Sequence, residues 1–66
     1  MNPAVAHVLQ FFTYAHLPAH LQEVSKPYAD LVNLVANSSS NAETTVALRF
    51  LLLSKDAAVR AKLVPS

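Results

Sequence analysis

The chain has 66 residues, of which 53% are hydrophobic and 14% are charged, and its formal net charge is +1. This length allows one domain, residues 1–66, and the absence of cysteine excludes disulfides and thiolate metal sites. The low charge without a basic run argues against a binder of duplex DNA or RNA, which usually carries a concentrated basic stripe. A chain this short hides only about 60% of the surface that its unfolded form exposes. Homo-oligomerisation is therefore the simplest way to cover the surplus apolar surface.

The first predicted element is a short helix from Pro3 to about Phe12. The sequence contains no glycine, the residue that most readily adopts the positive φ of tight β-hairpin turns, so an all-α fold is expected. Asn2 is placed to cap this helix, and proline suits its first position. Residues 13–17 are expected to form a connector. Four apolar residues share one helical face: Val5, Val8, Leu9 and Phe12.

The second predicted helix runs from Pro18 to about Ala36. Its apolar residues follow a heptad-like spacing of three and four. They are Leu21, Val24, Tyr28, Leu31 and Val35. Because Pro27 removes a backbone donor and clashes with the preceding turn, we expect a kink or restart at this point. Ser25 would then cap the second half of the helix.

The third predicted helix covers residues 41–63. Residues 37–39 are interpreted as a loop, and Ser40 with Glu43 three residues later has the capping-box pattern. Pro65 is expected to stop the helix. The fold class that follows is a short N-terminal helix plus an antiparallel helical hairpin, assembled as a homo-oligomer.

The segment from Val46 to Leu53 contains one polar residue, Arg49. A helix that is apolar nearly all round is normally buried on several sides, and here the second side has to come from another copy. Four residues apart on the same helix, Asp56 and Arg60 are expected to pair at the surface.

No targeting segment or membrane span is expected. The first 21 residues carry no Lys, Arg, Asp or Glu, but prolines, histidines, Asn2 and Gln10 interrupt them. A signal peptide needs a basic start and a smooth apolar middle, and a membrane span needs about 20 mostly apolar residues. We therefore expect a cytoplasmic protein.

The sequence holds no catalytic signature. His16 and His20 have helical metal-ligand spacing, and Glu23 lies three residues further on, but Pro18 separates the histidines and no metal site is predicted. The carboxylates do not form an evident acid–base pair, and no glycine elbow exposes a serine nucleophile. We predict a protein that is not an enzyme and needs no cofactor.

Binding of a small anion is a more interesting hypothesis. Phe11 lies off the main apolar face of the first helix, Tyr14 follows in the connector, and Lys26 sits beside the expected helix break. An aromatic ring can stack on a nucleobase, and a lysine can neutralise a phosphate. From spacing alone, however, the rings are better explained as packing residues and Lys26 as a solvated charge. Arg49 is interpreted as an ion-pair residue, and Arg60 complements the helix dipole.

Several short motifs occur together along nearly the whole chain: FTYAHLP, HLQ, SKP, ALR and KDAAVRA. In length, helix layout and these motifs the chain resembles the second type of phage-encoded anti-CBASS sponge proteins. CBASS is cyclic-oligonucleotide-based antiphage signalling. None of the motifs is a catalytic signature.

This resemblance implies a hexameric helical cage in the host cytoplasm. Such cages hold cyclic dinucleotides in pockets between subunits, and some members also hold cyclic trinucleotides at separate sites. The implied mechanism is sequestration without cleavage, which deprives a bacterial effector of its activating second messenger.

The resemblance also implies site residues. Lys26, in its SKP setting, matches the family's phosphate-contacting lysine, and Phe11 falls at the position of its base-stacking tyrosine. Tyr14 is the alternative stacking residue. The secondary ligand-binding candidates are His16, Thr44, Arg49 and Arg60.

The chain departs from the family's pattern at three places. Relatives tend to carry a charged residue at the position of Phe50, a Glu-Ala pair at residues 53–54 and a glycine at Ala29. The third helix is therefore more hydrophobic here than in the family's pattern, which is expected to affect subunit packing and any second ligand pocket. Two other interpretations remain: a helical protein–protein interaction module without a small ligand, and, less favoured because the basic stripe is missing, a small transcriptional regulator.

Overall fold

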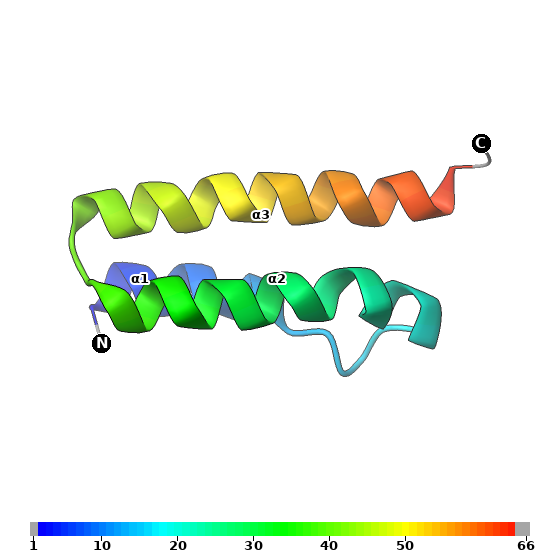
Figure 1. The fold of residues 1–66 in the computed structure, drawn as a ribbon, viewed down its shortest axis with the longest axis horizontal. Coiled ribbons are helices and arrows are strands. Elements are labelled where there is room, and N and C mark those ends of the chain that lie inside the picture. The colour runs from blue at the N-terminus through cyan, green and yellow to red at the C-terminus, as the bar shows by residue number, and fades with distance from the viewer. Residues whose placement is uncertain (1, 65–66) are drawn as a thin grey trace.

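A computed structural model of the chain describes residues 2–64, which form α-helices and one short 3-10 helix and contain no strand. The all-α prediction is confirmed. Figure 1 shows the two long helices, α2 and α3, side by side, with α1 behind α2 in this view, and α1 packs against both of them. No helix in the described part of the chain is both long and apolar enough to cross a bilayer. The elements are α1 (Pro3–Leu9), the 3-10 helix η1 (Gln10–Phe12), α2 (Ala19–Ser38) and α3 (Ala42–Leu63).

Helix α1 begins as the sequence predicts. The Asn2 side chain accepts a hydrogen bond from the Ala4 backbone N–H at 2.8 Å, and Pro3 occupies the first helical position. The Asn2 backbone N–H donates to Ser40 Oγ at 3.3 Å. This bond joins the start of α1 to the loop that precedes α3, although 38 residues separate them in the sequence.

Helix α2 continues through Pro27, so the expected restart of the helix was wrong. Pro27 and Glu23 are both exposed, which means that the carbonyl left without its helical donor lies on the solvent side, where water can satisfy it. Ser25 does not act as a cap, because its hydroxyl has no hydrogen-bond partner within residues 2–64. At the start of α2, Gln22 Nε2 donates to the Leu17 carbonyl at 2.7 Å and so fastens the connector to the first helical turn.

The buried face of α2 is turned about one residue away from the predicted stripe. Of that stripe only Leu21 is buried, Val24, Tyr28 and Val35 are half-buried, and Leu31 is exposed. The physical reason is size: small residues at the contact let the neighbouring helices approach closely, and the larger side chains flank it. The residues that α2 buries are Leu21, Ser25, Ala29, Val32 and Ala36.

The cap of α3 is Asn41, one residue after the predicted Ser40. Asn41 Oδ1 accepts from the Thr44 backbone N–H at 3.1 Å, and Thr44 Oγ1 accepts from the Asn41 backbone N–H at 3.1 Å. Ser40 is unsuited to this role because its hydroxyl receives the Asn2 N–H. The helix ends at Leu63, and Pro65, its expected stop, lies outside the described residues.

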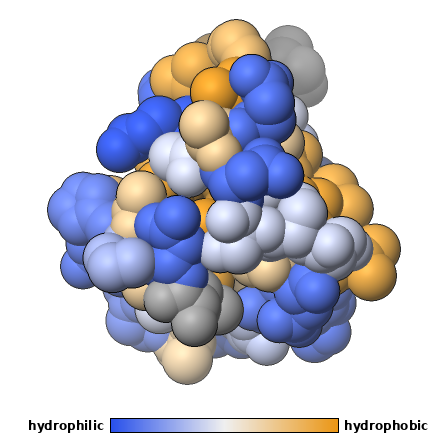
Figure 2. Space-filling view, turned by 90° about the vertical axis from the view of Figure 1, so that its left-hand side faces the viewer, coloured by the Kyte–Doolittle hydropathy of each residue, from blue (hydrophilic) through white to orange (hydrophobic). Residues whose placement is uncertain are grey.

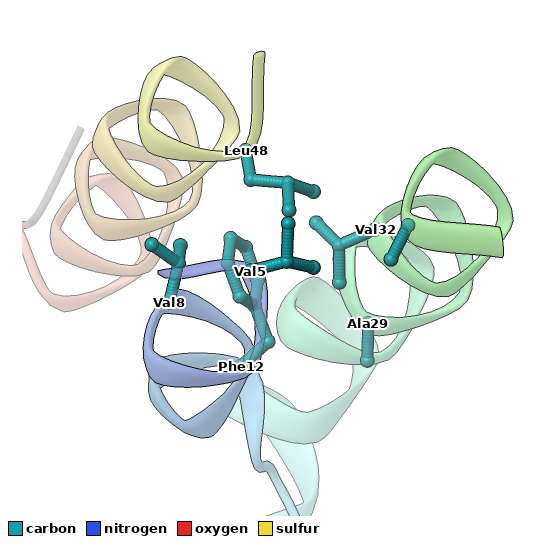
Figure 3. Packing of buried hydrophobic residues seen from close by; sticks show 7 residues of the cluster. Val5, Val8, Phe12, Ala29, Val32 and Leu48 are labelled. Carbon is teal, nitrogen blue, oxygen red and sulfur yellow. The ribbon is translucent and has the colours of Figure 1, made fainter. Parts of the chain in front are cut away.

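The core lies where the three α-helices meet. Figure 3 shows apolar side chains from all three converging on one another. Leu48 contributes the largest fully buried side chain and comes from α3. The buried cluster consists of Val5, Val8 and Phe12 from the N-terminal segment, Ala29, Val32 and Ala36 from α2, and Leu48.

Most of the apolar segment Val46–Leu53 stays outside this core. Leu48 is buried and Leu51 and Leu52 are half-buried, whereas Val46, Phe50 and Leu53 are exposed. One copy of the chain therefore covers only one side of α3.

Leu48→Ala is expected to lower the free energy of unfolding by about 2–5 kcal/mol, because it opens a cavity at the junction of three helices. Urea denaturation followed by circular dichroism, at one fixed protein concentration, measures the change. Lys62→Ala is the control, since Lys62 is exposed and outside the apolar surface, and its loss should change stability by no more than about 0.5 kcal/mol. Equal losses in both variants would contradict the assignment of the core.

Candidate functional site

A pocket of about 410 Å³ lies between the N-terminal part of α2, the C-terminal part of α3 and the segment that joins α1 to α2. This volume falls in the range of small-molecule sites. The pocket is lined by Gln10 and Phe11 of η1, Thr13, His16 and Leu17 of the connector, Ser25 of α2, and Lys55, Asp56, Val59 and Arg60 of α3.

Ser25 contributes an unpaired hydroxyl to the pocket. Its side chain is only 2% exposed, and Ser25 Oγ makes no hydrogen bond within the described residues. Leaving such a group buried and unpaired costs about 1–3 kcal/mol. Native proteins leave few polar atoms in this state. The Ser25 residue borders the pocket, but its hydroxyl oxygen is buried, so neighbouring side chains must move before a ligand can bond it.

Lys55 and Asp56 bring a partly buried ion pair to the same pocket. Lys55 Nζ lies 2.8 Å from Asp56 Oδ1 and 5.8 Å from the centroid of the Phe12 ring, and its side chain is 15% exposed. The predicted pair of Asp56 with Arg60 was wrong, since within residues 2–64 Asp56 pairs with Lys55 instead. Arg60 makes no ion pair within residues 2–64 and lines the pocket.

Phe11 forms an aromatic wall of the pocket. The tight turn of η1 directs Phe12 into the core and leaves Phe11 46% exposed. His7 packs against the Phe11 ring edge-to-face at a centroid distance of 5.6 Å, which holds the ring in place. An exposed, braced aromatic ring is suited to stacking on a flat heterocycle.

Three of the predicted binding residues thus meet in one place: Phe11, His16 and Arg60 all line the pocket. Lys26 does not line it, although it follows Ser25 in the sequence, because adjacent helical residues point in different directions. Lys26 Nζ bonds Asp30 Oδ2 at 2.9 Å. That hydrogen bond and the charge of Asp30 raise the pKa of the Lys26 ammonium, with a further contribution from Tyr14, so Lys26 is cationic at neutral pH.

The remaining predicted residues lie elsewhere. Tyr14 is half-buried and packs against the core cluster, and Arg49 is exposed on α3. Thr44 is buried, and its hydroxyl takes part in the α3 cap with Asn41 and lies 2.7 Å from Ser39 Oγ. A ligand could reach the Thr44 hydroxyl only by opening that cap.

Sequence reasoning missed the role of Ser25, and it did not foresee the pairing of Lys55 with Asp56. A signal for Ser25 was present: it lies four residues after Leu21 and four before Ala29, on the face that α2 buries. Lys55 had no such signal, because its position over the Phe12 ring depends on how α1 and η1 dock on α3.

The groups in the pocket offer stacking, positive charge and one hydrogen-bonding hydroxyl. Within residues 2–64 no group of three or more His, Asp or Glu side chains is arranged to hold a metal ion. No family model, curated protein or solved structure matches the chain. The lining thus combines the exposed Phe11 ring, the Lys55–Asp56 ion pair and the Arg60 guanidinium.

Ser25→Ala is expected to leave the free energy of unfolding unchanged or to raise it by up to about 1 kcal/mol, because it removes an unsatisfied buried hydroxyl. Thr44→Ala is the matched control and should lower it by about 0.5–2 kcal/mol through loss of a helix cap. Urea denaturation of the two variants compares them. A larger loss for Ser25→Ala than for Thr44→Ala would mean that the Ser25 hydroxyl has a structural partner.

Proposed function

We propose that the chain is a phage-encoded anti-defence protein that binds cyclic oligonucleotide second messengers in the host cytoplasm and sequesters them without cleavage. Cyclic dinucleotides are the principal ligands, and cyclic trinucleotides are a second class. The observation that carries the proposal is the pocket in which the exposed Phe11 ring, the unpaired Ser25 hydroxyl and Arg60 come together.

These groups complement the parts of a nucleotide. The Phe11 ring can stack on a base, and the Arg60 guanidinium can bind a phosphate through two parallel hydrogen bonds. If neighbouring side chains move aside, the Ser25 hydroxyl could gain the hydrogen bond that it lacks, which would relieve the cost of its burial. The motifs shared with the anti-CBASS sponge family support the same class of ligand.

A cyclic dinucleotide has two bases and two phosphates, more than one ring and one arginine can satisfy. A ligand that fills the pocket would extend beyond it, and Lys26, which is exposed and cationic, follows the pocket residue Ser25 in α2. Lys26 would bind a phosphate in exchange for, or together with, its exposed bond to Asp30. Surface pairs of this kind contribute little to stability, so the exchange costs little.

The proposed working form is a homo-oligomer of six subunits built from antiparallel α2–α3 hairpins. Exposed apolar side chains on both long helices support it, because a monomer rarely leaves such a surface uncovered. They include Leu31 and Leu34 of α2 and Val46, Phe50 and Leu53 of α3. A second subunit closing over a pocket would desolvate the phosphates and provide contacts to the other base.

Calorimetry of the full chain with 3′,3′-cyclic dinucleotides tests the function. We expect nanomolar binding, about −12 kcal/mol, with the ligand recovered intact. Phe11→Ala should weaken binding about ten- to hundredfold through the loss of one stacking contact. Lys62→Ala, which removes an exposed cation outside the pocket, is the control and should leave affinity unchanged. Absence of heat and of a thermal shift across the ligand panel would refute the proposal.

Lys26→Ala is expected to weaken the binding of cyclic dinucleotides while the molecular mass of the assembly stays the same. Within residues 2–64 the exposed Lys26 side chain bonds only Asp30, so its removal should not disturb the fold. Calorimetry and light scattering on the same sample give the two measurements. Unchanged affinity would exclude Lys26 from the site.

The second candidate function is a helical interaction module that binds no small ligand. The observation in its favour is the exposed apolar surface, which a different protein could cover. In that case the chain purified alone is monomeric or aggregates, and Phe11→Ala affects only stability. Size-exclusion chromatography with light scattering separates the two functions.

A further inference from the structure

The back of α3 carries a regular row of side chains that points away from the core. Its members recur at alternating spacings of three and four residues and lie opposite Leu48 on the helix. Figure 2 shows hydrophobic surface along the top of the molecule, which is the α3 side of Figure 1. We call this row the α3 seam: Glu43, Val46, Phe50, Leu53, Ala57 and Arg60, all of them exposed.

We propose that two copies of the chain pair through the α3 seam in antiparallel orientation. This inference names the contact behind the oligomer of the proposed function, but it depends only on α3 and not on nucleotide binding. Alternating spacings of three and four are the repeat that lets two helices interlock their side chains along a seam. Pairing would remove Phe50, which is 67% exposed, from water in both copies.

The charged residues decide the orientation. A parallel pair places each seam position against itself, so Glu43 would face Glu43 and Arg60 would face Arg60 of the second copy. In the antiparallel register that sets Phe50 opposite Leu53 of the second copy, Glu43 falls opposite Arg60. The antiparallel register thus places opposite charges at both ends of the seam, where the parallel pair would place like charges.

The residues beside the seam favour the same register. Arg49 and Asp56 flank the seam on one side of the helix. In the antiparallel pair Arg49 lies next to Asp56 of the second copy, and the two-fold axis repeats this contact. Asp56 bonds Lys55 through Oδ1, which leaves its other carboxylate oxygen to accept from Arg49.

The apolar layers also fit. Phe50 meets Leu53 in two adjacent central layers, and Val46 meets Ala57 in the layer on either side, so the larger side chains fill the centre of the seam and smaller ones flank it. The overlap from Glu43 to Arg60 is about 27 Å at 1.5 Å per residue and uses nearly the whole of α3. Such a contact is closed, because both copies use the same surface.

Cross-linking distinguishes the orientations, and the natural chain contains no cysteine that would interfere. The double variant Val46→Cys/Ala57→Cys should give covalent dimers with a short bismaleimide, because the two positions face each other in the antiparallel pair. Ala57→Cys alone should not, since its two copies would lie about 16 Å apart along the helices. Dimers from Ala57→Cys alone would indicate parallel pairing and overturn the proposal, as would no dimer from the double variant.

Phe50→Glu gives an independent test of the seam. By light scattering we expect it to reduce the mass of the natural assembly to half or less, down to the 7.1 kDa of one chain at the limit. Leu34→Glu is the matched control, since Leu34 is 64% exposed but lies on α2, and at the same protein concentration it should retain the seam contact and its cross-link. An unchanged mass for Phe50→Glu, or equal loss of cross-linking in both variants, would refute pairing through the seam.

Discussion

The docking of a short helix onto two long ones is the contact on which the rest of the molecule depends. Helix α1 is too short to persist alone in water, so it exists because Val5 and Val8 are buried against the longer helices. Its docking in turn determines what the following η1 turn can do. Phe12 enters the core, and Phe11 is left as the wall of a pocket. The docking of α1 therefore determines both the core, which contains Phe12, and the candidate site, which contains Phe11.

Small residues on the inner face of α2 border both the core and the candidate site. Ala29 lies in the core cluster, and one turn earlier Ser25 occupies the same face but lines the pocket. A large apolar residue in place of Ser25 would fill the pocket. The small serine side chain buries less apolar surface than such a residue but leaves the pocket open. Lys55 lies at a comparable boundary on α3, because its ammonium is close to the Phe12 ring of the core and bonds Asp56 of the pocket.

Helix positions followed from local chemistry, because caps, prolines and apolar periodicity act within a few residues. The cap of α3 was misplaced by one residue since Ser40 and Asn41 both suit it, and a distant bond from Asn2 decides between them. The inner face of α2 was misjudged for a related reason. The predicted face was based on the spacing of the larger apolar side chains, whereas close packing of the helices buries small residues of α2 such as Ala29 and Ala36. The prediction that Phe11 lies off the apolar face of its helix agrees with its exposure in the pocket, but the arrangement of Lys55 depends on contacts between helices.

Arg60 belongs to two surfaces, since it lines the pocket and ends the row of residues along the back of α3. A group that contributes to both a ligand and a subunit contact makes the two equilibria thermodynamically linked. If ligand binding strengthens subunit pairing, subunit pairing must strengthen ligand binding by the same factor. For the proposed oligomer, ligand affinity would then depend on protein concentration.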